Sequence, residues 1–162
     1  DLLGFILFFI FFSFFVFFAP NVLGHSDNYC EADPLVTPAH IVPEWYFLAQ
    51  YAILRGIPNK LLGVIAMVSS IIVLAFLPWL HVSKIRGSAY RPIFKKFYWL
   101  FIANFLLLVW LGSQPAEDPY VICAQLASAY YFGYILILTP LIGWLENYLL
   151  SFEIPNTNKK FK

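Results

Sequence analysis

The residues best suited to chemistry lie in one stretch, residues 34–60, between two long apolar runs. Pro34, Pro38 and Pro43 keep the first ten residues of this stretch extended, because proline fixes its own φ angle and restricts the residue before it. The sequence PEWYF then leads into a helix-compatible segment with one acid at its start, Glu44, and one base near its end, Arg55. Such a polar segment between hydrophobic spans could form the site of a membrane protein.

Pro43 fits the first position of the predicted helix, which puts the Glu44 carboxylate in the first turn, where the helix dipole stabilises it. One face of this helix would carry Glu44, Phe47, Leu48 and Tyr51. A carboxylate beside an apolar pocket can exchange a proton with a bound hydroxyl, and the two aromatic rings would suit a flat ligand. An interfacial helix with an N-terminal acid and an aromatic belt explains the same residues, so both interpretations stand.

The composition indicates a membrane protein. Of the 162 residues, 61% are hydrophobic and 12% are charged, whereas soluble domains average about 25% charged residues. The formal net charge of +1 gives no indication of a nucleic-acid partner. The sequence begins without Met and lacks the basic region of a signal peptide, so we expect it to be part of a longer protein.

The sequence predicts an all-α membrane protein with four transmembrane helices and a short interfacial helix in the first loop, since about 20 apolar residues cross a bilayer. The predicted helices cover residues 1–20, 61–80, 97–112 and 120–148, separated by a loop at 21–60, a basic loop at 81–96 and a turn at 113–119, and followed by a basic tail at 149–162. Asp1 would cap the first helix. Pro78 lies near the end of the second, and Pro140 should kink the fourth.

Loop charges predict the orientation. Residues 81–96 and 149–162 are basic, whereas 21–60 and 113–119 are acidic. By the positive-inside rule both ends face the negative side of the membrane, and residues 34–60 face the positive side. No acid or base lies deep within a span, which argues against a channel or transporter with a charge relay.

Polar residues inside the spans have structural interpretations. Asn104 should bond to a neighbouring helix, and Ser69 and Ser70 should bond back to their own backbone. Cys30 and Cys123 lack metal-site spacing, so we expect free buried thiols; a disulfide would require both on one side of the membrane. The predicted spans carry no pair of histidines, so the sequence offers no haem or metal site of its own.

The run PLVTPAHIVPEWYF, followed by YAILR and IPNK, resembles the C-terminal half of cytochrome b of the respiratory cytochrome bc1 complex. The sequences DLLGF, NVLGHSDNY and GSQPAEDPY resemble further landmarks, so the resemblance covers nearly the whole chain. It implies that Glu44 accepts a proton from quinol at the quinol-oxidation site. The residues implied to shape that pocket are Pro43, Trp45, Tyr46, Phe47 and Tyr51.

The resemblance implies further roles and partners. His40 and Lys60 match the surface near which the Rieske iron–sulfur protein docks, and Asp1 matches an acid that contacts quinone at the opposite, reducing site. The implied substrate pair is ubiquinone and ubiquinol. The family's four haem-ligating histidines lie in N-terminal helices outside this sequence. The family's quinone-site histidine and the lysine that precedes the counterpart of Asp1 are also missing from it. The two b haems would therefore be held by an N-terminal half.

The implied assembly is a dimeric ubiquinol–cytochrome c oxidoreductase that also contains cytochrome c1 and couples electron transport to proton translocation. The many phenylalanines fit an AT-rich organellar genome, which favours the mitochondrial inner membrane over a bacterial plasma membrane. Two alternatives remain. Subunit IV of the photosynthetic cytochrome complex shares PEWY and NKLLGV, but it has three spans and usually lacks the histidine found here as His40. A structural membrane-anchor subunit would use residues 34–60 only to dock a partner.

Overall fold

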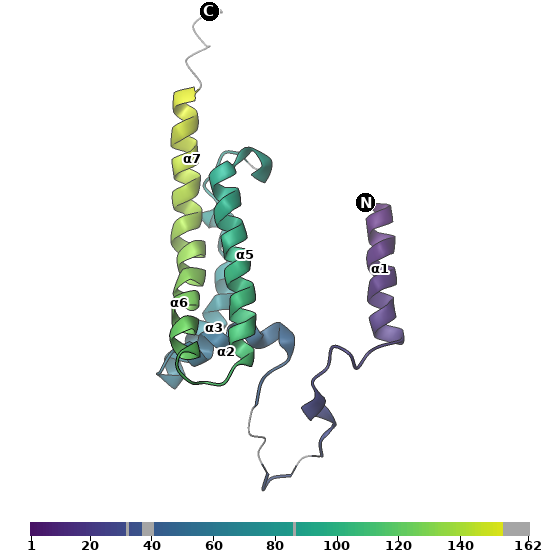
Figure 1. Ribbon diagram of the computed structural model, residues 1–162. Helices are drawn as coiled ribbons and strands as arrows, with labels where there is room; N and C mark the ends of the chain where they lie inside the picture. The colour runs from purple at the N-terminus through teal and green to yellow at the C-terminus, as the bar shows by residue number, and fades with distance from the viewer. Residues whose placement is uncertain (32, 37–40, 86, 154–162) are drawn as a thin grey trace, which may run out of the picture. The chain divides into compact units, whose positions relative to one another are not determined.

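The computed structural model describes residues 1–31, 33–36, 41–85 and 87–153. Every regular element in these residues is helical. His40 and the end of the predicted basic tail lie outside them. The chain divides into two compact units, Asp1–Trp45 and Tyr46–Lys162, which are described separately (Figure 1).

The first unit contains α1 (Leu2–Phe17) and the short 3₁₀ helix η1 (Ser26–Tyr29). α1 is apolar throughout and has no buried residue within its unit. Asp1 occupies the N-cap position, and its carbonyl oxygen accepts a hydrogen bond from the Phe5 amide at 3.0 Å. Its carboxylate makes no capping hydrogen bond, so the predicted side-chain cap is wrong.

The second unit is a helical bundle with three short helical turns and one π-helical turn. Its elements are η2 (Trp45–Phe47, beginning at the last residue of the first unit), α2 (Leu48–Gly56), α3 (Lys60–Ala75), α4 (Leu77–Leu80), η3 (Ser88–Tyr90), α5 (Pro92–Ser113), α6 (Tyr120–Gly133), the π-helical η4 (Tyr134–Leu138) and α7 (Thr139–Glu153). α5 runs alongside the continuous rod formed by α6, η4 and α7, and α2 packs near the end of α5 that leads into α6 (Figure 1).

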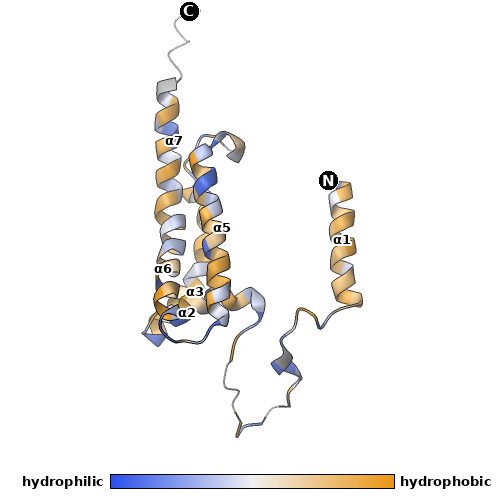
Figure 2. Cartoon of the chain, in the orientation of Figure 1, coloured by the Kyte–Doolittle hydropathy of each residue, from blue (hydrophilic) through white to orange (hydrophobic). Residues whose placement is uncertain are grey.

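Two helical stretches of the described chain are long and apolar enough to cross a membrane: Pro92–Ser113, of 22 residues, and Tyr120–Ser151, of 32 residues. Hydrophobic colour covers most of both stretches in Figure 2, and it also covers α1. Leu2–Phe17 and Lys60–Ala75 are apolar but shorter. Within the described residues the structure thus confirms the all-helical class and shows two candidate spans, and the count of four stays a prediction.

Prolines account for several helix boundaries. α5 begins at Pro92, so Lys95 and Lys96 lie on the helix and not in the preceding loop. The ring of Pro92 fits there because the first turn of a helix has no use for its missing N–H. The predicted helix at 61–80 is two helices, because α3 ends at Ala75 and the short α4 begins at Leu77 with Pro78 in its first turn.

The rod from α6 to α7 contains its irregularity just before Pro140. The Thr139 amide and hydroxyl both donate to the carbonyl oxygen of Tyr134, five residues earlier, and the hydroxyl bond measures 2.9 Å. This i→i+5 bonding makes residues 134–138 a π-helical turn. Proline cannot donate an amide hydrogen bond, and the π-helical turn lies directly before it. The kink expected at Pro140 stays a prediction.

Side-chain to backbone hydrogen bonds connect the bundle. Asn104 of α5 donates to the carbonyl of Ala127 on α6 at 3.0 Å, as predicted. Ser70 donates to Met67 within α3 at 2.6 Å, also as predicted, and the Ser70 carbonyl accepts from the Tyr131 hydroxyl at 2.9 Å. These bonds tie α3 and α5 to α6, around a core that includes Ile53, Leu108 and Ile135.

Both cysteines are free and exposed. The expectation of free thiols is therefore confirmed, whereas the expectation that they are buried is wrong. Cys30 follows η1 directly, and Cys123 lies in the first turn of α6 away from its packed face. A hydrophobic residue type in a membrane protein can face outward, because the surrounding lipid is itself apolar.

Candidate functional site

The PEWY sequence marks the transition from extended chain to helix. Residues 41–44 have no regular structure, the 3₁₀ turn η2 starts at Trp45, and α2 starts at Leu48. Pro43 and Glu44 are half-buried and precede the helix. The prediction that the helix begins at Pro43, with Glu44 in its first turn, is therefore wrong by two residues. The tighter 3₁₀ winding at a helix start displaces the expected single helical face.

Three aromatic side chains follow Glu44 without interruption. Trp45, Tyr46 and Phe47 are 57%, 56% and 47% exposed, respectively. The rings of Tyr46 and Phe47 lie 5.0 Å apart between centroids and are tilted by 53°. An acid followed directly by accessible rings offers a proton acceptor and flat apolar surface in one short segment.

Arg55 connects the far end of α2 to the bundle. Its Nη1 donates to the carbonyl oxygen of Gln114 at 2.7 Å, and its guanidinium carbon lies 5.1 Å from the ring centroid of Tyr51. Gln125 of α6 adds a second link, because its Nε2 donates to the Gly56 carbonyl at 2.8 Å. The last turn of α2 is thus fixed to both α6 and the end of α5.

Two glycines let α2 approach its neighbours closely. A Cβ atom at Gly112 of α5 would overlap the carbonyl oxygen of Leu48, and one at Gly63 of α3 would lie 2.7 Å from the carbonyl oxygen of Leu54. Ala49 and Ala52, each 2% exposed, keep the same approach possible from α2. Backbone-to-backbone packing therefore sets the position of the helix that carries Tyr51.

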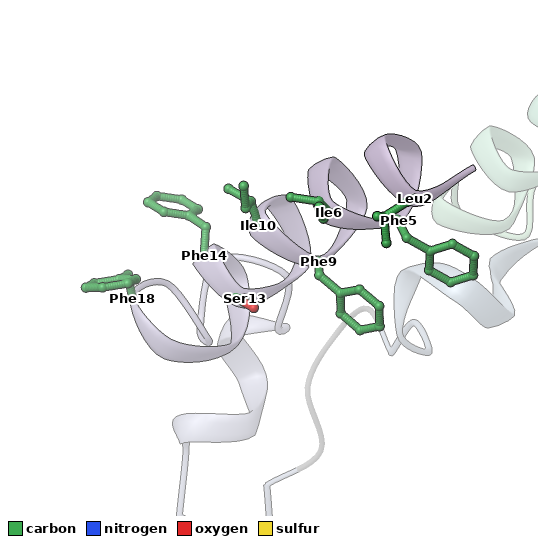
Figure 3. A pocket seen from close by; sticks show the side chains of 8 residues that line it. All are labelled: Leu2, Phe5, Ile6, Phe9, Ile10, Ser13, Phe14 and Phe18. Atoms are coloured by element: carbon green, nitrogen blue, oxygen red, sulfur yellow. The ribbon is translucent and has the colours of Figure 1, made fainter.

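The other predicted residues occupy separate places. Lys60 is exposed at the first position of α3, next to Asn59, whose side chain caps that helix by accepting from the Leu61 amide at 3.0 Å. Asp1 is exposed at the start of α1. A groove of about 770 Å³ runs along α1 from Leu2 to Phe18, with Ser13 as its polar member (Figure 3).

The structure groups some of these residues and not others. Tyr46 contacts Phe47, and Tyr51 contacts Arg55. The boundary between the two units falls inside PEWY, so Glu44 belongs to the first unit and Tyr51 to the second. Within the described part of the chain, no three His, Cys, Asp or Glu side chains gather where they could hold a metal ion.

Sequence reasoning missed a buried ion pair in the second unit. Arg91 Nε lies 2.6 Å from Glu146 Oε2, and the two side chains are 2% and 8% exposed. The sequence contained an indication of this pair, because Arg91 stands next to Pro92 and Glu146 is the single acid at the end of the last apolar run. Their separation of 55 residues hid the pairing.

Comparison with known proteins decides the family. A family model described as cytochrome b (C-terminal)/b6/petD matches residues 31–132. The chain belongs to this family. A cytochrome b from Chondrus crispus is 60% identical over 154 residues, covering 95% of this chain, and one from Rhodospirillum rubrum is 57% identical over 146 residues, covering 90% of it.

A solved structure agrees with this assignment. The chain is similar to a chain of a hyperthermophilic respiratory Complex III, with a TM-score of 0.76 and 33% identity over 87% of its length. It spans 40% and 36% of the two curated relatives and 35% of that solved chain. The sequence thus corresponds to the C-terminal portion of cytochrome b, a subunit of a Complex III-like assembly. The matched residues 31–132 include Glu44 and the whole of α2.

Proposed function

We propose that this portion of cytochrome b forms part of the quinol-oxidation site of a ubiquinol–cytochrome c oxidoreductase. The observation that carries the proposal is the order of side chains along residues 43–55, together with the packing of α2 within the second unit. A half-buried carboxylate directly precedes three accessible aromatic residues, and the helix that follows is fixed to α3, α5 and α6 by its backbone. A rigid support of this kind keeps a pocket wall in place while a substrate binds.

Glu44 is the proton acceptor in this proposal. Oxidation of ubiquinol releases two electrons and two protons. A carboxylate within hydrogen-bond reach of a quinol hydroxyl can take one of the protons, and the other leaves to water on the positive side of the membrane. A Rieske cluster and a b haem, the latter held by the N-terminal half, would each accept one electron. Glu44 lies in the irregular segment 41–44, directly before the 3₁₀ turn, and is half-buried. The carboxylate can then pass its proton to water on the positive side of the membrane.

The remaining predicted residues complete the proposal. Pro43, Trp45, Tyr46, Phe47 and Tyr51 shape the pocket, and His40 and Lys60 lie near the docking surface of the Rieske protein. Asp1 contacts quinone at the edge of the reducing site. The partners are the N-terminal half of cytochrome b, the Rieske protein and cytochrome c1 in a dimeric complex. The relatives from Chondrus crispus and Rhodospirillum rubrum leave two membranes open, the mitochondrial inner membrane and the bacterial plasma membrane.

A Glu44→Gln variant of the assembled complex tests the proton role. We expect quinol oxidation to slow by roughly a hundredfold, the lower end of the contribution of a positioned general base, at unchanged haem content. Glu117→Gln is the matched control, because Glu117 is an exposed acid in the turn before α6 and its side chain has no assigned role. Wild-type turnover in Glu44→Gln would refute the assigned role.

Inhibitor binding separates this function from a structural anchor. A quinone-site inhibitor should bind more weakly to Tyr51→Ala and Phe47→Ala variants, since both remove part of the proposed pocket wall. Tyr29→Ala removes an exposed ring outside the proposed pocket and should leave the affinity unchanged. An anchor subunit has no pocket to perturb, so identical affinities in all three variants would favour that alternative.

A further inference from the structure

The N-terminal end of α5 contains a buried charge with unused hydrogen-bonding capacity. Arg91, at 2% exposure, donates from Nε to Glu146 Oε2 and covers the ring of Phe94 at 4.2 Å. Both carboxylate oxygens of Glu146 have a partner, because the other oxygen accepts from the Phe94 amide at 3.0 Å. The carboxylate therefore closes the first turn of α5 and also binds Arg91.

Within the described part of the chain, the two terminal amino groups of Arg91 have no hydrogen-bond acceptor. Among the residues that the structure describes, Nε is the one guanidinium nitrogen of Arg91 that donates a hydrogen bond. An arginine has five N–H donors, and four of them are on the two Nη groups. In the described chain the fully buried side-chain atoms without a partner are Gln50 Oε1 and the hydroxyls of Tyr130 and Tyr134, and the Nη groups of Arg91 are not among them. These Nη groups therefore remain accessible to an added acceptor in the cavity that Arg91 lines.

The ion pair lies in the wall of a cavity of about 320 Å³. The remaining wall is mostly aliphatic and comes from the segment before α5, the start of α5 and the end of α7: Ile85, Tyr90, Pro92, Ile93, Leu149 and Leu150. A ligand that fills it must combine an oxygen acceptor for the guanidinium with hydrocarbon for the leucines and isoleucines. An amphiphile with an anionic head meets both conditions.

Neighbouring side chains place this cavity at the level of lipid headgroups. Tyr98 and Trp99 of α5 are 43% and 62% exposed, and the stacked rings of Trp144 and Tyr148 on α7 are 63% and 51% exposed. Exposed Trp and Tyr gather at membrane interfaces. The exposed Lys84 and Lys95 near the same end of the bundle add positive charge that suits an acidic lipid.

We propose that this cavity binds an anionic phospholipid, with its phosphodiester oxygens on the Nη groups of Arg91 and its glycerol and first acyl carbons against Ile93, Leu149 and Leu150. Glu146 fixes the guanidinium plane, so that the two Nη groups are presented to the phosphate as a fork. The lipid would thereby stabilise the contact between the start of α5 and the end of α7.

Native mass spectrometry of the purified complex tests the proposal. The complex is stripped of loosely bound lipid in detergent and titrated with phosphatidylglycerol. Arg91→Lys keeps a cation for Glu146 but loses the fork, and we expect it to weaken the tight phosphatidylglycerol site about tenfold, the size of one charge-assisted hydrogen bond. Leu149→Trp fills the cavity, leaves the ion pair intact and should abolish the site. Leu126→Trp adds the same bulk at an exposed position of α6 and should have no effect.

The outcomes separate the possible occupants. Loss of one bound phosphatidylglycerol in Leu149→Trp, but not in Leu126→Trp, supports the proposal. Equal lipid counts in wild type, Arg91→Lys and Leu149→Trp would overturn it. If millimolar inorganic phosphate displaces the lipid from the wild type, phosphate alone is the ligand and the lipid assignment is wrong. If phosphatidylcholine binds as tightly as phosphatidylglycerol, the preference for an anionic lipid is wrong.

Discussion

Arg55 holds Tyr51 from the following turn of the same helix. The guanidinium carbon lies 5.1 Å from the centre of the Tyr51 ring, while Nη1 donates to the Gln114 carbonyl oxygen at 2.7 Å. One cation thus connects a ring of the proposed quinol pocket to the turn between α5 and α6. A change at residues 113–119 can reach the pocket through this contact, although the turn itself carries none of the proposed pocket residues.

Arg55→Gln should impair quinol binding more than turnover. Loss of the cation–π contact at a half-buried site is expected to cost roughly 1 kcal/mol, which corresponds to about a fivefold rise in KM. Steady-state kinetics of the complex with a soluble quinol measures KM and kcat separately. Arg55→Lys retains a cation and should recover most of the affinity. An equal fall in kcat for both variants, with KM unchanged, would contradict a positioning role for Arg55.

Gly112→Ala should displace α2. The added methyl would overlap the Leu48 carbonyl, and backbone cannot move aside as a flexible side chain can. Overpacking of this kind costs about 1–3 kcal/mol. We expect a shorter half-life of the complex on heating and weaker binding of quinone-site inhibitors. Gly133→Ala is the matched control, since nothing lies within 4 Å of the corresponding Cβ position. Equal half-lives for the two variants would argue against the close contact.

Two adjacent tyrosines should respond differently to loss of their hydroxyl groups. The Tyr131 hydroxyl donates to the Ser70 carbonyl at 2.9 Å, whereas the buried Tyr130 hydroxyl has no partner among the described residues. Tyr131→Phe should therefore destabilise the protein by about 0.6 kcal/mol, a typical value for a hydrogen bond between membrane helices. Tyr130→Phe should be neutral or stabilising, because it removes an unpaired polar group. Thermal inactivation of the two variants under identical detergent conditions gives the comparison.

The Arg91–Glu146 pair should show strong coupling. Arg91→Met or Glu146→Leu alone leaves a buried charge unpaired and should cost about 3–5 kcal/mol, whereas the double variant should be much closer to wild type. The yield and thermal half-life of the assembled complex measure the three variants. Additive losses would mean that the two side chains do not form the buried pair.

The sequence predicts the local features of this fold well. Asn104 is a lone amide in an apolar run, and such a residue has few partners other than a neighbouring helix. Ser70 has its acceptor within its own turn. Both bonds could therefore be anticipated from spacing and polarity alone, as could the helical class and the family, which depends on the central PEWY region.

Features that depend on the surrounding structure were harder to predict. The start of the helix after Pro43 was misplaced because proline is compatible both with a first helical position and with extended chain before a 3₁₀ turn. The exposure of Cys30 and Cys123 depends on which helix faces are covered, and periodicity is weak where nearly every residue is apolar. The partners of Arg55 and Arg91 lie 59 and 55 residues away, so local patterns give no access to them.

The hydrogen bond from the Phe94 amide to Glu146 can form only after Glu146 has been added to the growing chain. The acceptor is translated 52 residues after the donor, a delay of roughly 3–10 s at typical elongation rates. During that interval the Phe94 amide in the first turn of α5 lacks the Glu146 carboxylate as its acceptor, and Arg91 lacks its counter-ion. A ribosome that stalls before the codon for Glu146 therefore leaves Arg91 without its counter-ion at the start of α5, which distinguishes an unfinished chain from a finished one.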